Sequence, residues 1–242
     1  MQNRYVGDIG DYGKYALLRA IAPTGFPLGV NWYLTPDESH NADGKYITYL
    51  YDDRFRFLDR GLYLAIKDIV DKGERHVRSI QHAGILPEST LFYDQILDYA
   101  CDPGERRMRR EAWHRAALDT LQSCDIVFLD PDNGLQVGSS LTARKGNKYI
   151  GLDELKDYIR LGKSVIFYNH RERKKEGEYL KRFIPLRDES AFMGCRWLGL
   201  KYVRGTIRDY FFILQMKHFA PIQARCEDLL QVWKEHFSAL LI

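Results

Sequence analysis

Short apolar runs and longer amphipathic segments alternate along most of the chain. Three of the runs, Leu28–Leu34, Asp125–Leu129 and Ser164–Tyr168, are rich in β-branched and aromatic residues. Runs of this length and composition predict buried strands. Strands that are covered on both faces lose the strict alternation of apolar and polar residues, which is typical of parallel sheets. We therefore expect these three strands to form the centre of a mainly parallel sheet.

Segments with apolar residues at helical spacing separate these strands. They predict helices at Lys14–Ile21, Arg60–Lys72, Glu105–Gln122, Leu152–Leu161, Arg171–Phe183 and Pro221–Leu240. Near the end of the chain, Arg196–Tyr202 and Tyr210–Met216 flank a turn at Arg204-Gly-Thr and predict a β-hairpin. This alternation favours an α/β fold. We expect a three-layer Rossmann-like fold, with a mostly parallel sheet and a C-terminal antiparallel hairpin.

The composition is that of a globular protein. With 45% hydrophobic and 29% charged residues among 242, the chain differs from disordered sequences. No repeat or low-complexity linker divides it, so we expect a single Rossmann-like domain over residues 1–242. The apolar runs are too short to span a bilayer, so no membrane partner is expected. The four cysteines form no paired motif and the first residues lack an apolar signal stretch, so we expect reduced thiols and a cytoplasmic location.

Polar residues directly follow one of the most apolar predicted strands. The sequence Asp130-Pro-Asp-Asn-Gly comes after Asp125–Leu129. It places Asp130, Asp132 and Asn133 on a turn above the sheet. These residue types form turns readily, so a purely structural turn is one interpretation. The position favours a functional role, because parallel sheets bind ligands at the carboxyl ends of their strands. Carboxylates there suit hydrogen bonds from an amine, or a metal ion.

A histidine follows the next predicted strand in a similar way. Asn169 and His170 come after Ser164–Tyr168, and would face Asp130 and Asp132 if the two strands are neighbours. A histidine near carboxylates can act as a general base or as a metal ligand. The structural alternative is a histidine that caps the following helix.

The N-terminal stretch Gly7-Asp-Ile-Gly-Asp-Tyr-Gly-Lys14 has an unusual composition. Three glycines and two aspartates precede the lysine. Glycines allow the backbone to approach a ligand closely, and a lysine can reach a carboxylate or a phosphate. The stretch is not a P-loop, because it lacks a Gly-Lys-Ser/Thr sequence and no strand precedes it.

These motifs resemble those of the bacterial 23S rRNA adenine-N6 methyltransferases that act on free rRNA. Their opening motif, Ala-Gly-Asn-His-Ala-Asp-Val-Leu-Lys-His, aligns with residues 6–15, and Gly7, Asp11 and Lys14 are identical. Their catalytic Asp-Pro-Pro-Tyr motif follows the fourth strand, where this chain has Asp130-Pro131. Asp132-Asn133 stands in the place of the Pro-Tyr pair. The resemblance implies a Rossmann-like fold in which Asp130 accepts hydrogen bonds from the amine of a flipped base.

The same resemblance implies S-adenosylmethionine as cofactor. Gly7, Asp11 and Lys14 would then line the cofactor and base pocket. The segment Val30–Glu38 stands where the family has a glycine-rich turn for the cofactor, which makes Asn31 and Asp37 candidate cofactor-binding residues. No glycine-rich turn is present in this segment.

Basic residues adjoin the candidate site. They form three groups: Arg106, Arg107, Arg109, Arg110 and Arg115; Arg144, Lys145 and Lys148; and Arg171, Arg173, Lys174, Lys175, Lys181 and Arg182. A charged run is usually a solvated helix face. Three of them near one site, with Trp32, Tyr33 and Tyr168 available to stack bases, favour a nucleic-acid partner.

Three functions remain open from the sequence. The first is an S-adenosylmethionine-dependent methyltransferase acting on a nucleic-acid base. The second is a metal-dependent nuclease or hydrolase, in which Asp130, Asp132 and His170 hold a divalent ion that activates water. The third is a non-catalytic module that binds a nucleotide or nucleic acid. The absent glycine-rich turn favours the second and third, whereas the N-terminal motif and the terminal hairpin favour the first.

Overall fold

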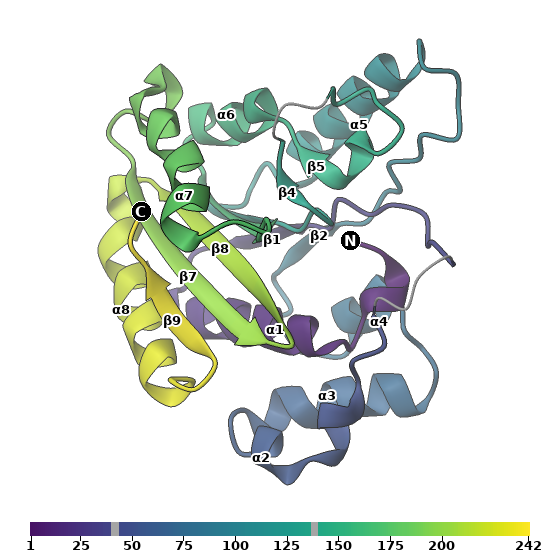
Figure 1. Cartoon of the computed structure of the whole chain (residues 1–242), viewed down its shortest axis with the longest axis vertical. Helices are drawn as coiled ribbons and strands as arrows, with labels where there is room; N and C mark the ends of the chain where they lie inside the picture. Colours follow the sequence, from purple (N-terminus) through teal and green to yellow (C-terminus); the bar gives the residue numbers. More distant parts are fainter. Residues whose placement is uncertain (40–43, 137–139) are drawn as a thin grey trace.

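The computed structural model describes residues 1–39, 44–136 and 140–242, and within these ranges a seven-stranded sheet runs through the molecule (Figure 1). Its strands lie in the order β2-β1-β3-β6-β8-β7-β9. In chain order they are β1 (Leu28–Asn31), β2 (Leu91–Tyr93), β3 (Ile126–Leu129), β6 (Ser164–His170), β7 (Arg196–Arg204), β8 (Thr206–Leu214) and β9 (Phe237–Leu240).

The sheet is parallel on one side and antiparallel on the other. Strands β2, β1, β3 and β6 are parallel, with Val30 paired to Phe128 and Phe128 to Ile166. Strand β8 pairs antiparallel with β6 and β7, and β9 pairs antiparallel with β7. The structure thus confirms a mixed α/β fold with parallel central strands and antiparallel C-terminal strands. It also confirms that β3 is an interior strand.

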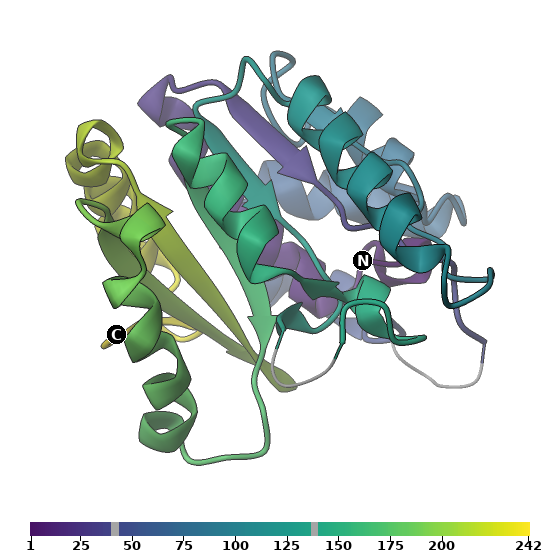
Figure 2. The same ribbon diagram turned by 90° about the horizontal axis from the view of Figure 1, so that it is seen from above.

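Alternate residues of each central strand point to opposite faces of the sheet, and both faces are covered. Ile126 and Phe128 belong to the core on one face, whereas Val127 and Leu129 belong to the core on the other. The first face is covered by α1 (Ile9–Ile21), α3 (Arg60–Asp71), α4 (Val77–His82) and α8 (Met216–Val232). The second is covered by α5 (Arg106–Thr120), α6 (Leu152–Arg160) and α7 (Glu176–Leu180), as Figure 2 shows. Burial on both faces explains the continuous apolar runs of the sequence.

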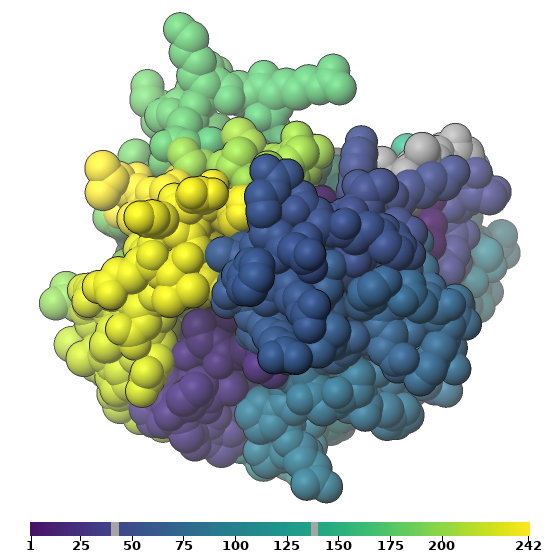
Figure 3. All heavy atoms as spheres, turned by 90° about the horizontal axis from the view of Figure 1, so that it is seen from below, coloured from purple at the N-terminus to yellow at the C-terminus, as the bar shows by residue number. Residues whose placement is uncertain are grey.

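Smaller elements complete the fold. The short helix α2 (Asp53–Arg56) precedes α3, and a two-stranded parallel sheet joins β4 (Gly134–Leu135) to β5 (Tyr149–Ile150). Figure 3 shows α1 in a groove between α8 and the segment that carries α2 and α3. Within the described residues no helix is both long and apolar enough to cross a bilayer.

Several predicted boundaries are wrong. The predicted helix Pro221–Leu240 instead ends at Val232. Residues Phe237–Leu240 form the edge strand β9, which pairs with β7 of the hairpin. Phe237 and Leu240 are buried while the two residues between them are exposed, which is the alternation of a strand. The edge strand β2 was not predicted, since only three residues pair and one of them is buried.

Two more segments differ from their predicted helix or strand. Of the predicted helix Arg171–Phe183, only Glu176–Leu180 is α-helical, and Arg171 instead binds the buried Asp209 of β8 with distances of 2.7 and 2.9 Å. The predicted strand Leu28–Leu34 stops at Asn31. The three residues that follow have no regular secondary structure.

The strand order locates a crevice. From β1 the chain moves to β2 on one side, and then to β3 on the other side of β1. Such a reversal is a topological switch point, and ligands of open α/β sheets bind outside the carboxyl ends of the strands there. The N–H of Asp130 donates to the carbonyl of Asn31 at 2.9 Å, so Asp130 stands directly at this point.

Candidate functional site

A cavity of about 370 Å³ lies at the carboxyl ends of β3 and β6. Its wall brings together residues from the N-terminal motif, the Asp130 turn, the end of β6 and strand β8. Of the predicted catalytic residues, Asp130, Asp132, Asn133 and His170 all line it. Its volume lies within the range of small-molecule pockets in proteins. The structure therefore gathers into one cavity the motifs that the sequence predicted to converge.

The N-terminal motif contributes the first turns of α1. The helix begins at Ile9, earlier than the predicted Lys14, because the Asp8 side chain caps it by accepting the N–H of Gly10 at 2.9 Å. Asp11 and Lys14 therefore lie three residues apart on one face of a helix. The Lys14 ammonium pairs with Asp11 at 2.7 Å, and both side chains line the cavity.

The same lysine joins the two motifs of the resemblance. Lys14 Nζ lies 2.7 Å from Asp130 Oδ2, and the two side chains are only 4% and 6% exposed. The ammonium thus bridges Asp11 and Asp130, which come from the N-terminal helix and from the turn after β3. Loss of the lysine would leave two buried carboxylates with no cation between them, which is the costly way to break such a bridge.

Two carboxylates and one ammonium share this buried position. Burial raises the pKa of Asp130 and of Asp11 above the ordinary aspartate value, although Lys14 acts in the opposite direction. Burial alone would lower the pKa of Lys14, but the attraction of Asp11 and Asp130 outweighs it, and the pKa lies above the usual lysine value. The lysine is therefore a fixed cation, while Asp130 binds protons more readily than an exposed aspartate does.

The second aspartate of the turn has different partners. The Met1 ammonium lies 2.6 Å from Asp132, and the Gln2 side chain donates to Asp132 at 2.7 Å. Burial would raise the pKa of Asp132, but the ammonium outweighs burial and the pKa is lowered. The Asp132 carboxylate is therefore ionised and is paired with a different cation from the one that contacts Asp130. Asn133 follows it, and its carbonyl accepts the N–H of His170 at 3.2 Å, which ties the turn to the end of β6.

The turn after β1 does not have the role that the sequence predicted. Asn31 is fully buried and its amide binds the hydroxyl of Tyr158 and the N–H of Tyr33, both at 3.1 Å. Trp32 and Tyr33 are fully buried as well, so they cannot stack bases. Tyr33 has a φ of 43°, the only positive value outside glycine among the described residues. Packed side chains thus occupy the place where the resemblance implies a glycine-rich turn.

Two other predicted cofactor residues also lie outside the cavity wall. Asp37 accepts the N–H of Arg4 at 3.2 Å, and so stabilises the N-terminal segment. The N–H of Gly7 donates to Asp11 Oδ2 at 3.2 Å, which orients that carboxylate from behind. Gly7 has a φ of 82°, a conformation that explains the glycine. Of the predicted cofactor residues, Asp11 and Lys14 line the cavity.

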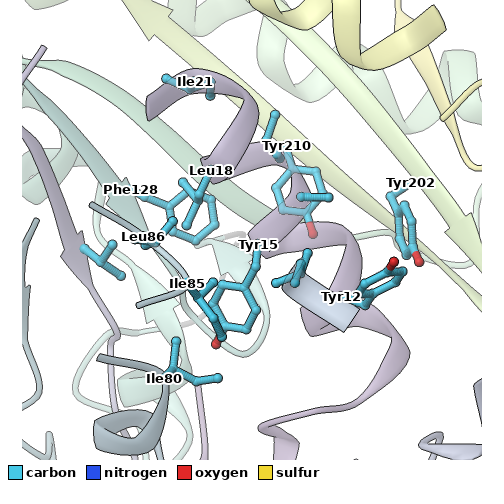
Figure 4. Close-up of a cluster of buried hydrophobic side chains, with 14 of the residues drawn as sticks. Tyr12, Tyr15, Leu18, Ile21, Ile80, Ile85, Leu86, Phe128, Tyr202 and Tyr210 are labelled. Carbon is cyan, nitrogen blue, oxygen red and sulfur yellow. The ribbon is translucent and has the colours of Figure 1, made fainter. Parts of the chain in front are cut away.

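The far wall contains residues that sequence reasoning missed. Arg208 and Tyr210 of β8 line the cavity beside Tyr168 and His170 of β6. Tyr210 is fully buried, and its hydroxyl has no partner among the described residues. In Figure 4 its ring lies beside α1. The alternation of side chains along a strand could have identified them, because Arg208 and Tyr210 share one face of β8. Asp209 between them points to the other face and binds Arg171.

The basic groups contribute less to the site than expected. Arg110 is buried and binds Glu154 Oε1 at 2.6 Å, so it stabilises the packing of α5 on α6. Of the three predicted groups, Lys145 and Lys148 line the cavity. The Lys148 ammonium pairs with Glu38 at 2.6 Å, whereas Lys145 is exposed.

The acidic residues of the site do not fit a shared metal ion. No group of three His, Cys, Asp or Glu side chains within the described ranges is placed to hold one. Asp130 is paired with the Lys14 ammonium and Asp132 with the Met1 ammonium. His170 Nδ1 instead interacts with the Tyr168 hydroxyl at 3.2 Å. A divalent ion would have to displace both ammonium groups, so we derive no reaction step through a metal.

We expect Tyr210→Phe to stabilise the folded protein. Removing an unpartnered buried hydroxyl relieves its desolvation cost, so the free energy of unfolding should rise by about 1 kcal/mol. Tyr202→Phe is the matched control, because this buried hydroxyl donates to the carbonyl of Ile9 at 3.1 Å (Figure 4). Its loss should lower the free energy of unfolding by about 1 kcal/mol. Urea unfolding of both variants tests the pair, and a loss in both would contradict an unpartnered Tyr210.

Comparisons with known proteins add no family to this geometry. No protein-family model matches the chain, and a search of curated proteins finds no match.

Proposed function

We propose that the protein is an S-adenosylmethionine-dependent methyltransferase that acts on an amino group of a nucleic-acid base. One observation carries the proposal: Lys14 of the N-terminal motif directly contacts Asp130 of the Asp-Pro motif, at 2.7 Å inside a ligand-sized cavity. The resemblance rests on these two motifs, and it implies that they share one pocket. A contact between residues 116 positions apart in the sequence supports that implication.

The arrangement of the sheet also supports the proposal. The cavity lies at the switch point of the strand order, which is where open α/β sheets bind ligands. Helices on both faces and the antiparallel strand β8 beside β6 are consistent with a three-layer Rossmann-like methyltransferase. We include this finer fold assignment in the proposal.

The residues that line the cavity are better suited to bind the cofactor than the residues that follow β1. Bound S-adenosylmethionine supplies a methyl group on a positively charged sulfur. Asp11 and Asp130 offer negative charge to such a group, and the Tyr168 ring lies in the same wall. Arg208 offers positive charge to its carboxylate. Asn31 and Asp37 have no place in this assignment.

Asp130 has the main role toward the acceptor. Its carboxylate can accept a hydrogen bond from the exocyclic amine and orient the nitrogen lone pair toward the methyl group. As the new N–C bond forms, the methyl–sulfur bond would break to leave a neutral thioether, and the amine must lose a proton. The raised pKa of Asp130 makes its carboxylate a better proton acceptor than an ordinary aspartate. Lys14 holds the carboxylate in place and limits its rotation.

Two measurements test the proposed function. Calorimetry should detect S-adenosylmethionine binding to the wild-type protein, and total RNA or DNA should incorporate label from methyl-labelled cofactor. Asp130→Asn should reduce transfer at least tenfold, because a hydrogen bond to a charged group contributes about 1.5–3 kcal/mol. The variant should fold, since Lys14 keeps Asp11 as a partner at 2.7 Å. No cofactor binding and no transfer would refute the proposal, and a parallel titration with Mn²⁺ that shows binding would favour the hydrolase.

A further inference from the structure

The cavity has an acidic interior and an aromatic, basic mouth. Asp11 and Asp130 lie inside and are almost fully buried. Tyr46 and Lys145 line the same cavity but are exposed, and 59% of Tyr46 is accessible. This division suits a ligand whose flat, amine-bearing part enters the cavity while an anionic part stays at the mouth.

Tyr46 is an exposed aromatic side chain on a fixed backbone. Its N–H donates to Asp8 Oδ2 at 3.2 Å, and its carbonyl accepts the N–H of Ile9 at 3.0 Å. Both partners belong to the start of α1, which also carries Asp11 and Lys14. When the backbone of an exposed tyrosine is already fixed, ligand binding immobilises only the side chain, so the loss of conformational entropy is small. Nucleic-acid bases stack readily on such rings. The stacking ring that the Asp-Pro-Pro-Tyr motif would supply is absent here, and Tyr46 is placed to replace it.

Tyr210 presents a hydrogen-bond group in the interior. Its hydroxyl is buried without a partner among the described residues, although its side chain lines the cavity. An unpartnered buried hydroxyl is costly, so a ligand that satisfies it gains specificity. Burial raises the pKa of Tyr210 well above the usual tyrosine value, which keeps the hydroxyl protonated and able to donate.

Lys145 is the available cation at the mouth. It is exposed, and its ammonium forms no ion pair or hydrogen bond with the described part of the chain. Lys148 and Arg208, by contrast, pair with Glu38 and Asp8. A lysine without a protein partner beside an aromatic side chain suits a phosphate group.

We propose that the cavity binds a single nucleotide unit whose base carries an exocyclic amine, with Tyr46 stacking on the base. In this arrangement the Asp130 carboxylate accepts a hydrogen bond from the amine. The Tyr210 hydroxyl donates one to a ring nitrogen, and the Lys145 ammonium contacts the phosphate. The inference deepens the proposed function and rests on it for the role of the base as methyl acceptor. Nucleotide binding itself needs no cofactor.

Ligands that differ by one group test the recognition. Calorimetric titration of the wild-type protein should show binding of adenosine monophosphate. Inosine monophosphate should bind at least tenfold more weakly, because it has a carbonyl in place of the amine that donates a hydrogen bond to Asp130. Ribose 5-phosphate, which lacks a base, should show no measurable binding. A single-stranded adenylate hexamer distinguishes a nucleotide within a nucleic acid from a free one, and we expect it to bind more tightly than the monophosphate.

Paired variants test the residues. Tyr46→Ala should weaken binding of the tighter adenylate ligand roughly five- to a hundredfold, the range found when one stacked base loses its aromatic partner. Tyr51→Ala is the control, since Tyr51 is also exposed but does not line the cavity. Lys145→Ala should weaken binding of adenosine monophosphate but not of adenosine, which has no phosphate. Arg144→Ala removes the same charge one position away and should change the affinity for neither ligand. Tyr210→Phe should weaken binding while it stabilises the fold.

The outcomes separate this inference from the proposed function. Adenylate binding that depends on Tyr46 and Lys145, without S-adenosylmethionine binding, would support the nucleotide site and refute the methyltransferase. Binding of S-adenosylmethionine without binding of adenylate would support the methyltransferase and refute the nucleotide site. Equal effects of Tyr46→Ala and Tyr51→Ala, or equal affinity for the adenosine and inosine ligands, would overturn the inference even if a nucleotide binds. Thermal unfolding of each variant shows whether it is folded.

Discussion

Lys14→Met should lower the free energy of unfolding by about 3–5 kcal/mol at pH 7, the cost typical of breaking a buried ion pair. The Lys14 ammonium contacts Asp11 and Asp130 at 2.7 Å each, and all three side chains are nearly inaccessible to water. Without the lysine, two carboxylates remain buried together with no cation between them. They must either carry an uncompensated charge or take up protons.

The loss should depend on pH in a definite direction. In the wild-type protein the pKa of Lys14 is raised, so its contribution is complete below the ordinary lysine pKa and is lost as pH rises through the folded value. In the variant the pKa values of Asp11 and Asp130, already raised by burial, should rise further. The folded variant then binds more protons than the unfolded chain, so its stability falls as pH rises. The difference from the wild type should therefore be larger at pH 8 than at pH 5.

An exposed lysine provides the control. Lys72 also pairs with an aspartate at 2.7 Å, but Lys72 and Asp68 are 57% and 61% exposed. Solvent screens such a pair, so Lys72→Met should leave unfolding by urea unchanged within error. The ion-pair distances are equal, so the comparison sets a buried lysine between two carboxylates against an exposed lysine beside one. A loss in Lys14→Met as small as that in Lys72→Met, or one that does not change with pH, would show that the bridge is not buried in solution.

The parts of the fold that depend on the local pattern of apolar and polar residues could be predicted from the sequence. The runs Asp125–Leu129 and Ser164–Tyr168 became β3 and the first five residues of β6, because strands covered on both faces leave a continuous apolar signal. The convergence of Asp130 and His170 also followed, since both stand at carboxyl ends of adjacent parallel strands. The N-terminal motif joined them because its lysine is long enough to reach Asp130 from α1.

The remaining parts depend on contacts that no local pattern encodes. Trp32 and Tyr33 look like exposed stacking rings in the sequence, yet both are buried, on opposite faces of the sheet. The Tyr33 hydroxyl binds Glu154 of α6 at 3.1 Å, whereas the Trp32 ring packs edge-on against Tyr15 of α1. Arg110 looks like part of a basic surface but is the buried partner of the same glutamate. Tyr210 entered the site only because β8 inserts beside β6, and the sequence does not reveal which strands of a hairpin will be neighbours.

The glycine that ends the Asp130 turn illustrates how a turn motif fixes a site. Gly134 has a φ of 102°, which L-residues rarely adopt. A Cβ atom there would lie 2.0 Å from Asn169 Oδ1 and 2.7 Å from the Asn169 Cα. Asn169 cannot move aside easily, since its amide accepts the N–H of Leu135 at 2.9 Å and donates to the Tyr179 hydroxyl at 2.6 Å. The glycine thus allows the Asp130 turn to pack directly on the end of β6.

Gly134→Ala should therefore lower the free energy of unfolding by about 2–5 kcal/mol, the sum of a left-handed backbone cost and an overpacking cost. It should also weaken binding of ligands in the cavity, because the turn that holds Asp130 must shift away from β6. Gly162→Ala separates the two costs: Gly162 has a φ of 77° but no atom within 4 Å of its Cβ position. That variant should lose only the backbone part, about 1–2 kcal/mol. Equal losses in urea unfolding would mean that the turn does not pack against Asn169, and that packing on β6 does not fix the position of Asp130 in the cavity.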